Sequence, residues 1–131
     1  MKSYRFELPC FEESDGTLGV FEPPSIPGFQ ANRLFYIFDV PVGEVRANHA
    51  CTNSSIVFIA MAGSVRLSVE SNAETMEYIL DNKSTAVFVP QASWIKAYDF
   101  STDAVLVGMS DMRYANCHYI NDYGRYRKLM E

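Results

Sequence analysis

The stretch SSIVFIAMAGSVRLSVE, residues 54–70, decides the fold class of this chain. In its second half Val65, Leu67 and Val69 are apolar and alternate with polar residues. Side chains of a β-strand point alternately to opposite faces, so this pattern predicts a strand with one buried face. The first half is almost wholly apolar, and Ala62-Gly63-Ser64 between the halves predicts the turn of a hairpin.

Short apolar runs of the same kind lie on both sides of this stretch, separated by turn residues. They are NRLFYIFDV (32–40), TMEYIL (75–80), TAVFVP (85–90), SWIKAYDF (93–100) and AVLVGMS (104–110). Regularly spaced short strands are typical of a β-sandwich or barrel, whereas βαβ units need helical stretches between them. With no linker or internal repeat in view, we expect one all-β domain over residues 1–131.

Two segments depart from the strand pattern. PPSIPGF (23–29) predicts a rigid, proline-rich loop. Near the C-terminus four apolar side chains are spaced four, three and four residues apart, as on one face of a helix: Tyr119, Tyr123, Tyr126 and Met130. Asn116 is a candidate cap for this helix, so the expected fold ends in a short C-terminal α-helix.

The net charge of −5 argues against nucleic acid as a partner, because neutralising phosphates requires a basic face. No apolar run approaches the roughly 20 residues that cross a bilayer, and residues 1–9 lack the apolar core of a signal peptide. We therefore expect a cytoplasmic protein with no membrane partner. The widely spaced Cys10, Cys51 and Cys117 predict reduced thiols and neither a disulfide framework nor a zinc site.

The stretch VGEVRANHACTN, residues 42–53, contains a damaged metal motif. Gly43 and His49 fit the opening of the metal-binding cupin pattern, in which a second His, a Glu and a later His complete the ligands. Cys51, Ile56 and Ile95 occupy those three positions. Because aliphatic side chains cannot coordinate a metal, we expect neither a bound metal nor any other cofactor.

A narrower resemblance extends over most of the chain, from Asp15-Gly16 to Tyr123. NRLFYIFDV, VRANHA, AGSVRLSV, SWIKAYDFS and YINDY, in this order and spacing, resemble the sugar-nucleotide 3,4-ketoisomerases of the cupin superfamily, the WxcM-like group. The resemblance implies a jelly-roll cupin barrel, a homodimer and a dTDP-linked 4-keto-6-deoxyhexose as the small-molecule ligand. It also implies that the keto group moves from C4 to C3 without a metal.

Keto migration runs through an enediol, which requires a base, a stabilised oxyanion and a returned proton. The resemblance places the catalytic groups on His49 as the base and Tyr36 as a proton shuttle, with Arg46 anchoring substrate oxygens. A neutral imidazole suits the base because its pKa lies near neutrality.

Cys51 stands where the resemblance implies a second catalytic histidine. Residues 49 and 51 of a strand face the same way, so His49 could activate the thiol as a nucleophile or as a substitute base. The alternative is a buried or pocket-lining thiol without a chemical role. Three further residues are candidates for substrate binding or, alternatively, for ordinary core and surface roles: Trp94, Arg33 and Arg66.

Three functions follow from these residues. The first is a sugar-nucleotide cupin of the 3,4-ketoisomerase type, whose turnover depends on what has replaced the missing imidazoles. The second is a catalytically degenerate cupin that binds a small carbohydrate-like or apolar ligand. The third, a metal-dependent cupin enzyme, is opposed by Ile56 and Ile95.

Overall fold

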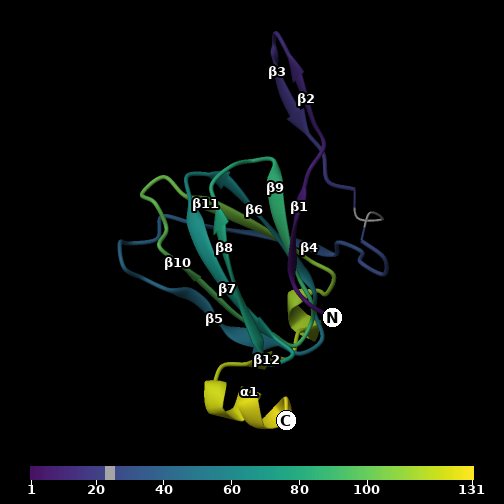
Figure 1. The fold of residues 1–131 in the computed structure, drawn as a ribbon, viewed down its shortest axis with the longest axis vertical. Coiled ribbons are helices and arrows are strands. Elements are labelled where there is room, and N and C mark those ends of the chain that lie inside the picture. Colours follow the sequence, from purple (N-terminus) through teal and green to yellow (C-terminus); the bar gives the residue numbers. More distant parts are fainter. Residues whose placement is uncertain (23–25) are drawn as a thin grey trace.

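The computed structural model describes residues 1–22 and 26–131, and in this part of the chain two five-stranded antiparallel sheets form the body (Figure 1). The first sheet has the order β1-β9-β6-β11-β4, with bounds Tyr4–Glu7, Thr85–Val89, Ile56–Ala62, Val105–Ser110 and Arg33–Phe38. The second has the order β12-β5-β10-β7-β8, with bounds Tyr119–Ile120, Arg46–Cys51, Ser93–Tyr98, Val65–Ser71 and Glu74–Leu80. The sheets face each other as in a jelly roll, which confirms the predicted all-β cupin class.

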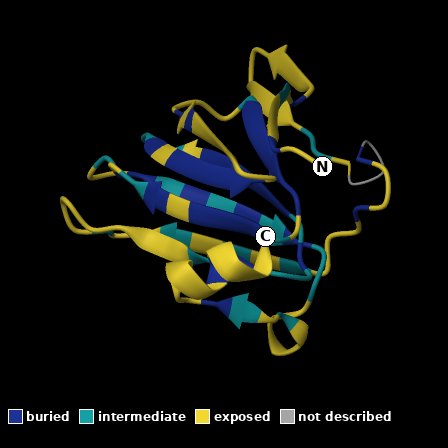
Figure 2. Ribbon diagram, turned by 60° about the horizontal axis from the view of Figure 1, so that its bottom comes forward, coloured by how far each residue is buried: buried dark blue, intermediate teal, exposed yellow. Residues whose placement is uncertain are grey.

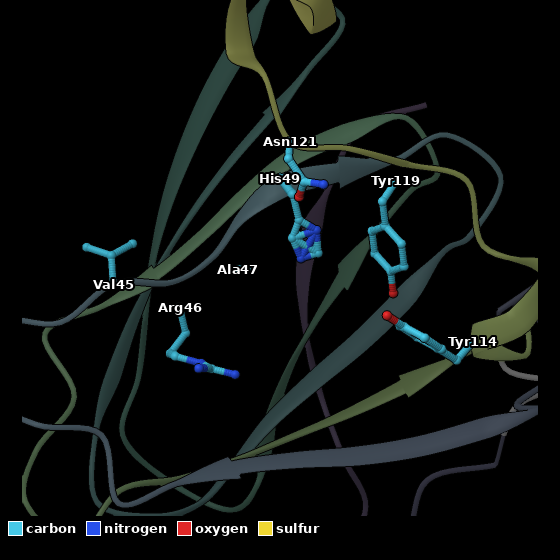
Figure 3. Close-up of a pocket in the computed structure, with 7 residues that line it drawn as sticks. All are labelled: Val45, Arg46, Ala47, His49, Tyr114, Tyr119 and Asn121. Carbon is cyan, nitrogen blue, oxygen red and sulfur yellow. The ribbon is translucent and has the colours of Figure 1, made fainter.

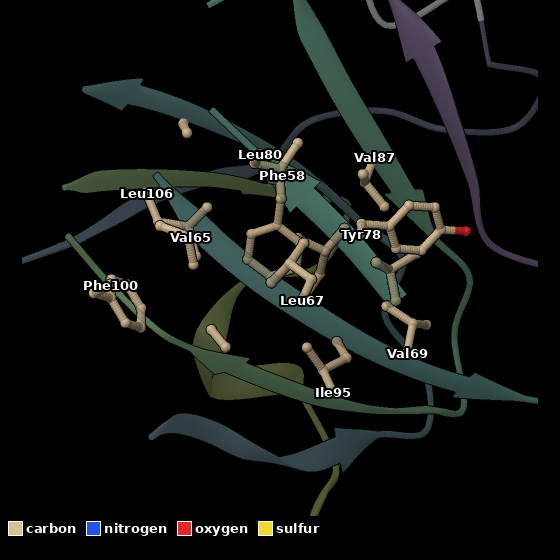
Figure 4. Packing of buried hydrophobic residues seen from close by; sticks show 14 of the residues in the cluster. Phe58, Val65, Leu67, Val69, Tyr78, Leu80, Val87, Ile95, Phe100 and Leu106 are labelled. Carbon is tan, nitrogen blue, oxygen red and sulfur yellow. The ribbon is translucent and has the colours of Figure 1, made fainter. Parts of the chain in front are cut away.

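Apolar side chains from both sheets meet between them and form the main core (Figure 4). Val65, Leu67 and Val69 of β7 all point into it and are at most 1% exposed, so the predicted alternation is confirmed. Phe58 and Leu106 of the first sheet belong to the same cluster. Burying one such side chain stabilises the fold by about 1.5–3 kcal/mol, which fixes the register of β7.

The predicted hairpin at Ala62-Gly63-Ser64 is wrong. β6 pairs with β9 and β11, whereas β7 pairs with β8 and β10, so the chain passes from one sheet to the other at this point. Gly63 has a φ of +64°, and a Cβ on it would lie 2.8 Å from the Cα of Ala104. The corner packs so closely against the loop before β11 that it requires a glycine.

A second apolar cluster covers the outer face of the first sheet. Ile26 and Phe29, which precede β4, pack there with Val57 and Phe88. The predicted proline-rich loop falls in this region, and its residues 23–25 lie outside the described residues.

A hairpin of β2 (Cys10–Glu13) and β3 (Gly16–Gly19) projects away from the two sheets (Figure 1). All eight of its strand residues are exposed, as the yellow arrows of Figure 2 show. Phe11 and Leu18 pair across it and are 56% and 63% exposed. This hairpin therefore adds no side chain to either core.

The C-terminal helix exists but begins later than predicted. Helix α1 spans Tyr123–Leu129, and its cap is Asp122, whose carboxylate accepts a hydrogen bond from the backbone N–H of Arg125 at 3.1 Å. Asn116 lies instead in a 3₁₀ turn, η2 (Tyr114–Asn116), and Tyr119 lies in strand β12. No helix in the described parts of the chain has the length and apolar character needed to cross a membrane.

Candidate functional site

A β-bulge in β5 determines which side chains reach the space between the sheets. Ile95 pairs with His49, but the next residue of β10, Lys96, pairs with Ala47, so one residue of β5 has no counterpart. Ala47 and Asn48 have φ values of +67° and +59°. The extra residue reverses the alternation. As a result His49 and Arg46, three positions apart, both face the cavity (Figure 3).

Two adjoining cavities open beside this bulge. The outer one has a volume of about 440 Å³ and is lined by Val45, Arg46, Ala47, His49, Tyr114, Tyr119 and Asn121 (Figure 3). The inner one has a volume of about 340 Å³ and shares Arg46, His49 and the two tyrosines. Its floor is apolar and includes Ile56, Phe58, Ile95 and Leu106. A polar rim above an apolar floor is the usual character of a small-molecule site.

His49 is poised as a base. Its Nδ1 atom is buried, and within residues 1–22 and 26–131 no side chain or backbone group forms a hydrogen bond with it. Burial lowers the pKa of the imidazole below its ordinary value, because the charged form loses hydration. At neutral pH the ring is therefore uncharged and able to accept a proton.

Arg33 and Tyr119 form a connected pair on the other side of the cavity. An Nη of Arg33 donates to the Tyr119 hydroxyl at 3.3 Å, and the guanidinium lies over the ring of Tyr114, 5.5 Å from its centroid. The Nε of Arg33 is buried and lacks a partner in the described part of the protein. A buried donor without a partner is costly, which suits a site completed by a ligand.

Tyr119 was missed by the sequence analysis as a site residue. Its ring lies 4.8 Å from the His49 ring, centroid to centroid. Tyr119 pairs with Cys51 across β12 and β5, and the diagonal position on the same face of a strand pair is His49. The usable signal was Asp122, which caps a helix as well as Asn116 does, because a helix that starts there leaves Tyr119 in an extended segment.

Cys51 is buried and does not line either cavity. Its thiol donates to the Oδ1 of Asn53 at 3.2 Å, and burial, with the nearby Cys117 thiol, raises its pKa. A thiol that remains protonated at neutral pH is a poor nucleophile and a poor base. This environment fits the packing role and opposes the activated thiol that the sequence left open.

Tyr36 lies on the outer face of β4. The strand alternates, with Phe35 and Ile37 pointing inward, while Tyr36 is 59% exposed and stacks on Phe38 with 5.7 Å between ring centroids. It also contributes to the wall of the inner cavity, which His49 lines as well. The structure therefore places the expected shuttle and the expected base on one cavity, but the aromatic ring that contacts His49 is that of Tyr119.

Trp94 and Arg66 also lie away from the cavity. Trp94 is buried against α1 and donates its Nε1 proton to Asn48 of the bulge at 3.2 Å. Arg66 points outward from β7, where its Nε lies 3.4 Å from a carboxylate oxygen of Asp99. We assign neither residue a contact with a ligand, because adjacent strand residues face opposite sides of a sheet.

Ile56 and Ile95 both line the apolar floor, at positions where the metal pattern requires a Glu and a His. Among the residues that the structure describes, no three His, Cys, Asp or Glu side chains are grouped so that they could hold a metal ion. The polar side chains that line the outer cavity with His49 are those of Arg46, Tyr114, Tyr119 and Asn121, a set without a carboxylate or a second imidazole, which does not fit a divalent cation.

The double sheet and the histidine-bearing cavity define a cupin-type jelly roll with a small-molecule pocket between its sheets. The chain belongs to the WxcM-like, C-terminal family, whose sequence model matches residues 1–131. It is 29% identical over 116 residues to the TDP-4-oxo-6-deoxy-alpha-D-glucose-3,4-oxoisomerase of Aneurinibacillus thermoaerophilus. That alignment covers 88% of this chain and 84% of the relative.

Solved structures show the same fold. WlaRA from Campylobacter jejuni, a TDP-fucose-3,4-ketoisomerase, superposes with a TM-score of 0.90 at 27% identity, covering 100% of this chain and 97% of the other. The 3,4-ketoisomerase QdtA from Thermoanaerobacterium thermosaccharolyticum, solved in complex with TDP, superposes with a TM-score of 0.90 at 23% identity. That match covers 98% of this chain and 94% of QdtA.

Proposed function

We propose that this protein is a sugar-nucleotide 3,4-ketoisomerase that acts on a TDP-linked 4-keto-6-deoxyhexose. The observation that carries the proposal is the neutral imidazole of His49, unpartnered among the described residues and facing a cavity in a member of this family. The relative from A. thermoaerophilus is named for this reaction on a TDP-linked 4-oxo-6-deoxyglucose.

His49 is the base that removes the proton from C3. The inner cavity, of about 340 Å³, offers an apolar floor that includes Ile56 and Ile95. Such a floor suits the methyl group of a 6-deoxy sugar, because the contact removes apolar surface of both the methyl group and the floor from water. A hydroxymethyl group at the same place would bury an unpaired hydroxyl.

The arginines supply positive charge at two depths. Arg46 lines both cavities near the opening, where its planar fork suits the diphosphate of a sugar nucleotide. Arg33 lines the inner cavity, and its buried Nε has no partner among the described residues. The two charges favour an anionic ligand although the chain as a whole is acidic.

We also propose that the protein is a cytoplasmic homodimer. Leu34, Tyr36 and Phe38 form an apolar row on the outer face of β4, each more than 50% exposed. Exposed apolar rows of this kind on an edge strand are typical of protein interfaces. Light scattering should give twice the chain mass of 14.8 kDa, and a monomeric mass would contradict the dimer. The three free cysteines fit a reducing compartment.

The test of the function is deuterium exchange at C3 of TDP-4-keto-6-deoxyglucose in D₂O. The wild type should incorporate deuterium and form the 3-keto product, and His49→Asn should lose at least 100-fold in rate, as expected when a general base is removed. His118→Asn is the matched control, since His118 is exposed and lines neither cavity. A wild type that is stabilised by TDP but exchanges no deuterium would refute catalysis and leave a binding protein.

A further inference from the structure

We propose that Tyr119 is the catalytic acid of this site and carries the proton between the two reacting oxygens of the substrate, with Arg33 as its positioning residue. This inference rests on the proposed ketoisomerase function and assigns its second proton-transfer group. The sequence placed Tyr119 on one face of the predicted C-terminal helix and gave it no role in the chemistry.

The geometry places Tyr119 beside the base and inside the cavity. Its ring lies against His49, and it lines both the outer and the inner cavity. Figure 3 shows its hydroxyl directed into the pocket, next to that of Tyr114. Tyr114 is 69% exposed at the opening, whereas Tyr119 is half-buried, so the Tyr119 hydroxyl is the one positioned near a sugar ring that contacts His49.

The remaining proton carriers of the chain are not available for this role. The chain has two histidines, and His118 is exposed outside both cavities. The Cys51 thiol is engaged with Asn53, and its pKa is raised by burial. Tyr36 has its ring on the outer face of β4. Tyr119, paired directly with Cys51 across the sheet, carries its hydroxyl on a ring that lies against the His49 ring.

The charge state of Tyr119 suits an acid. Burial raises the pKa of its phenol, while the Arg33 guanidinium acts in the opposite direction. At neutral pH the hydroxyl is therefore protonated and can donate, and the guanidinium can stabilise the phenolate that forms. His49 and Tyr119 thus have pKa values displaced in opposite directions, the arrangement expected of a base and an acid that work together.

The step balances without an external oxidant or reductant. His49 takes the proton from C3, the electron pair of that bond forms the C3–C4 double bond, and the C4 oxygen takes the Tyr119 proton. The Tyr119 phenolate then removes the proton from the C3 hydroxyl, so that the C3 carbonyl forms and C4 recovers a proton from the His49 imidazolium. Both residues end as they began.

The experiment compares Tyr119→Phe with Tyr4→Phe, which removes a tyrosine hydroxyl outside both cavities. General acid catalysis typically contributes about 10²–10⁴-fold, so we expect Tyr119→Phe to lower kcat for isomerisation at least 100-fold and Tyr4→Phe less than threefold. Deuterium exchange at C3 should fall less than product formation, because the enediolate returns to substrate when its second proton transfer is slow. The TDP-induced rise in melting temperature should be unchanged.

Arg33→Gln tests the positioning residue through the pH profile. Since the guanidinium lowers the pKa of Tyr119, its removal should move the alkaline limb of kcat/KM to higher pH. An unmoved limb would overturn the role of Arg33. A Tyr119→Phe variant within threefold of wild type, or one whose exchange and product formation fall equally, would overturn the role of Tyr119 alone. A wild type without any isomerisation would refute the proposed function and this role together.

Discussion

Replacing Gly63 by alanine tests the corner that joins the two sheets. Its φ of +64° lies in the left-handed region, where a Cβ costs about 1–2 kcal/mol. The added Cβ would also lie 2.8 Å from the Cα of Ala104, so the backbone of that loop must move, and overpacking of this kind costs about 1–3 kcal/mol. We therefore expect the free energy of unfolding to fall by about 3 kcal/mol.

The matched control is Gly43→Ala. Gly43 has a φ of +86°, but no atom lies within 4 Å of a Cβ built there, so only the backbone cost applies. The unfolding entropy of a chain of 131 residues is about 0.28 kcal/mol/K, so the loss of about 3 kcal/mol expected for Gly63→Ala corresponds to a drop in Tm of about 11 °C. Gly43→Ala should lower the Tm by about 4–7 °C. If Gly63→Ala and Gly43→Ala lowered stability equally in urea and thermal unfolding, Gly63 would be an ordinary turn residue. That result would refute the close packing of this corner against the loop before β11.

Four other outcomes are expected. Burial lowers the pKa of His49, so kcat/KM should rise with pH through a limb centred below the ordinary histidine value of about 6.5 and then level off. The same shift makes the unfolded chain bind more protons, so stability should fall as the pH drops below about 6.5, and His49→Asn should remove this component in urea titrations. Cys51→Ala should keep kcat within threefold in the exchange assay, because the thiol is protonated and bonded to Asn53, and a 100-fold loss would restore the thiol as a catalytic group. Glu70→Gln should cost about 1–3 kcal/mol in urea unfolding, since it removes the buried carboxylate charge whose Oε2 lies 2.7 Å from Nη1 of Arg127 in α1, and no change would contradict that anchoring.

The strands were predictable from the sequence, but their assignment to sheets was not. Alternation in β7 correctly identified Val65, Leu67 and Val69 as core residues, because burial of one face acts on every second residue. The same pattern carries no information on which strand lies beside which. A short connection such as Ala62-Gly63-Ser64 suggested pairing of its neighbours, whereas contacts with Ala104, far along the chain, decide the corner.

The site was predictable only where the strands are regular. His49 faces the cavity as expected, but Arg46 reaches it through the bulge at Asn48, which reverses the alternation. That bulge depends on left-handed backbone conformations at Ala47 and Asn48. The identity of these two residues does not by itself predict a bulge at this position. Tyr119 was expected on the C-terminal helix because the helix start was placed too early, and periodicity gives the face of a residue only after the element type and its boundaries are right. Tyr36 lies in the predicted strand, and only the resemblance gave it a role in the site.

The isoleucines that damage the metal motif have a second consequence for the chemistry. Ile56 and Ile95 make the floor of the cavity apolar, and burial against such a surface disfavours the charged form of every titratable group beside it. For His49 burial favours the free base, and for Tyr119 it favours the intact acid. One physical effect therefore sets the base and the acid in the states that proton transfer requires. Cys51 lines neither cavity, and its own burial raises the pKa of its thiol and keeps it out of the reaction.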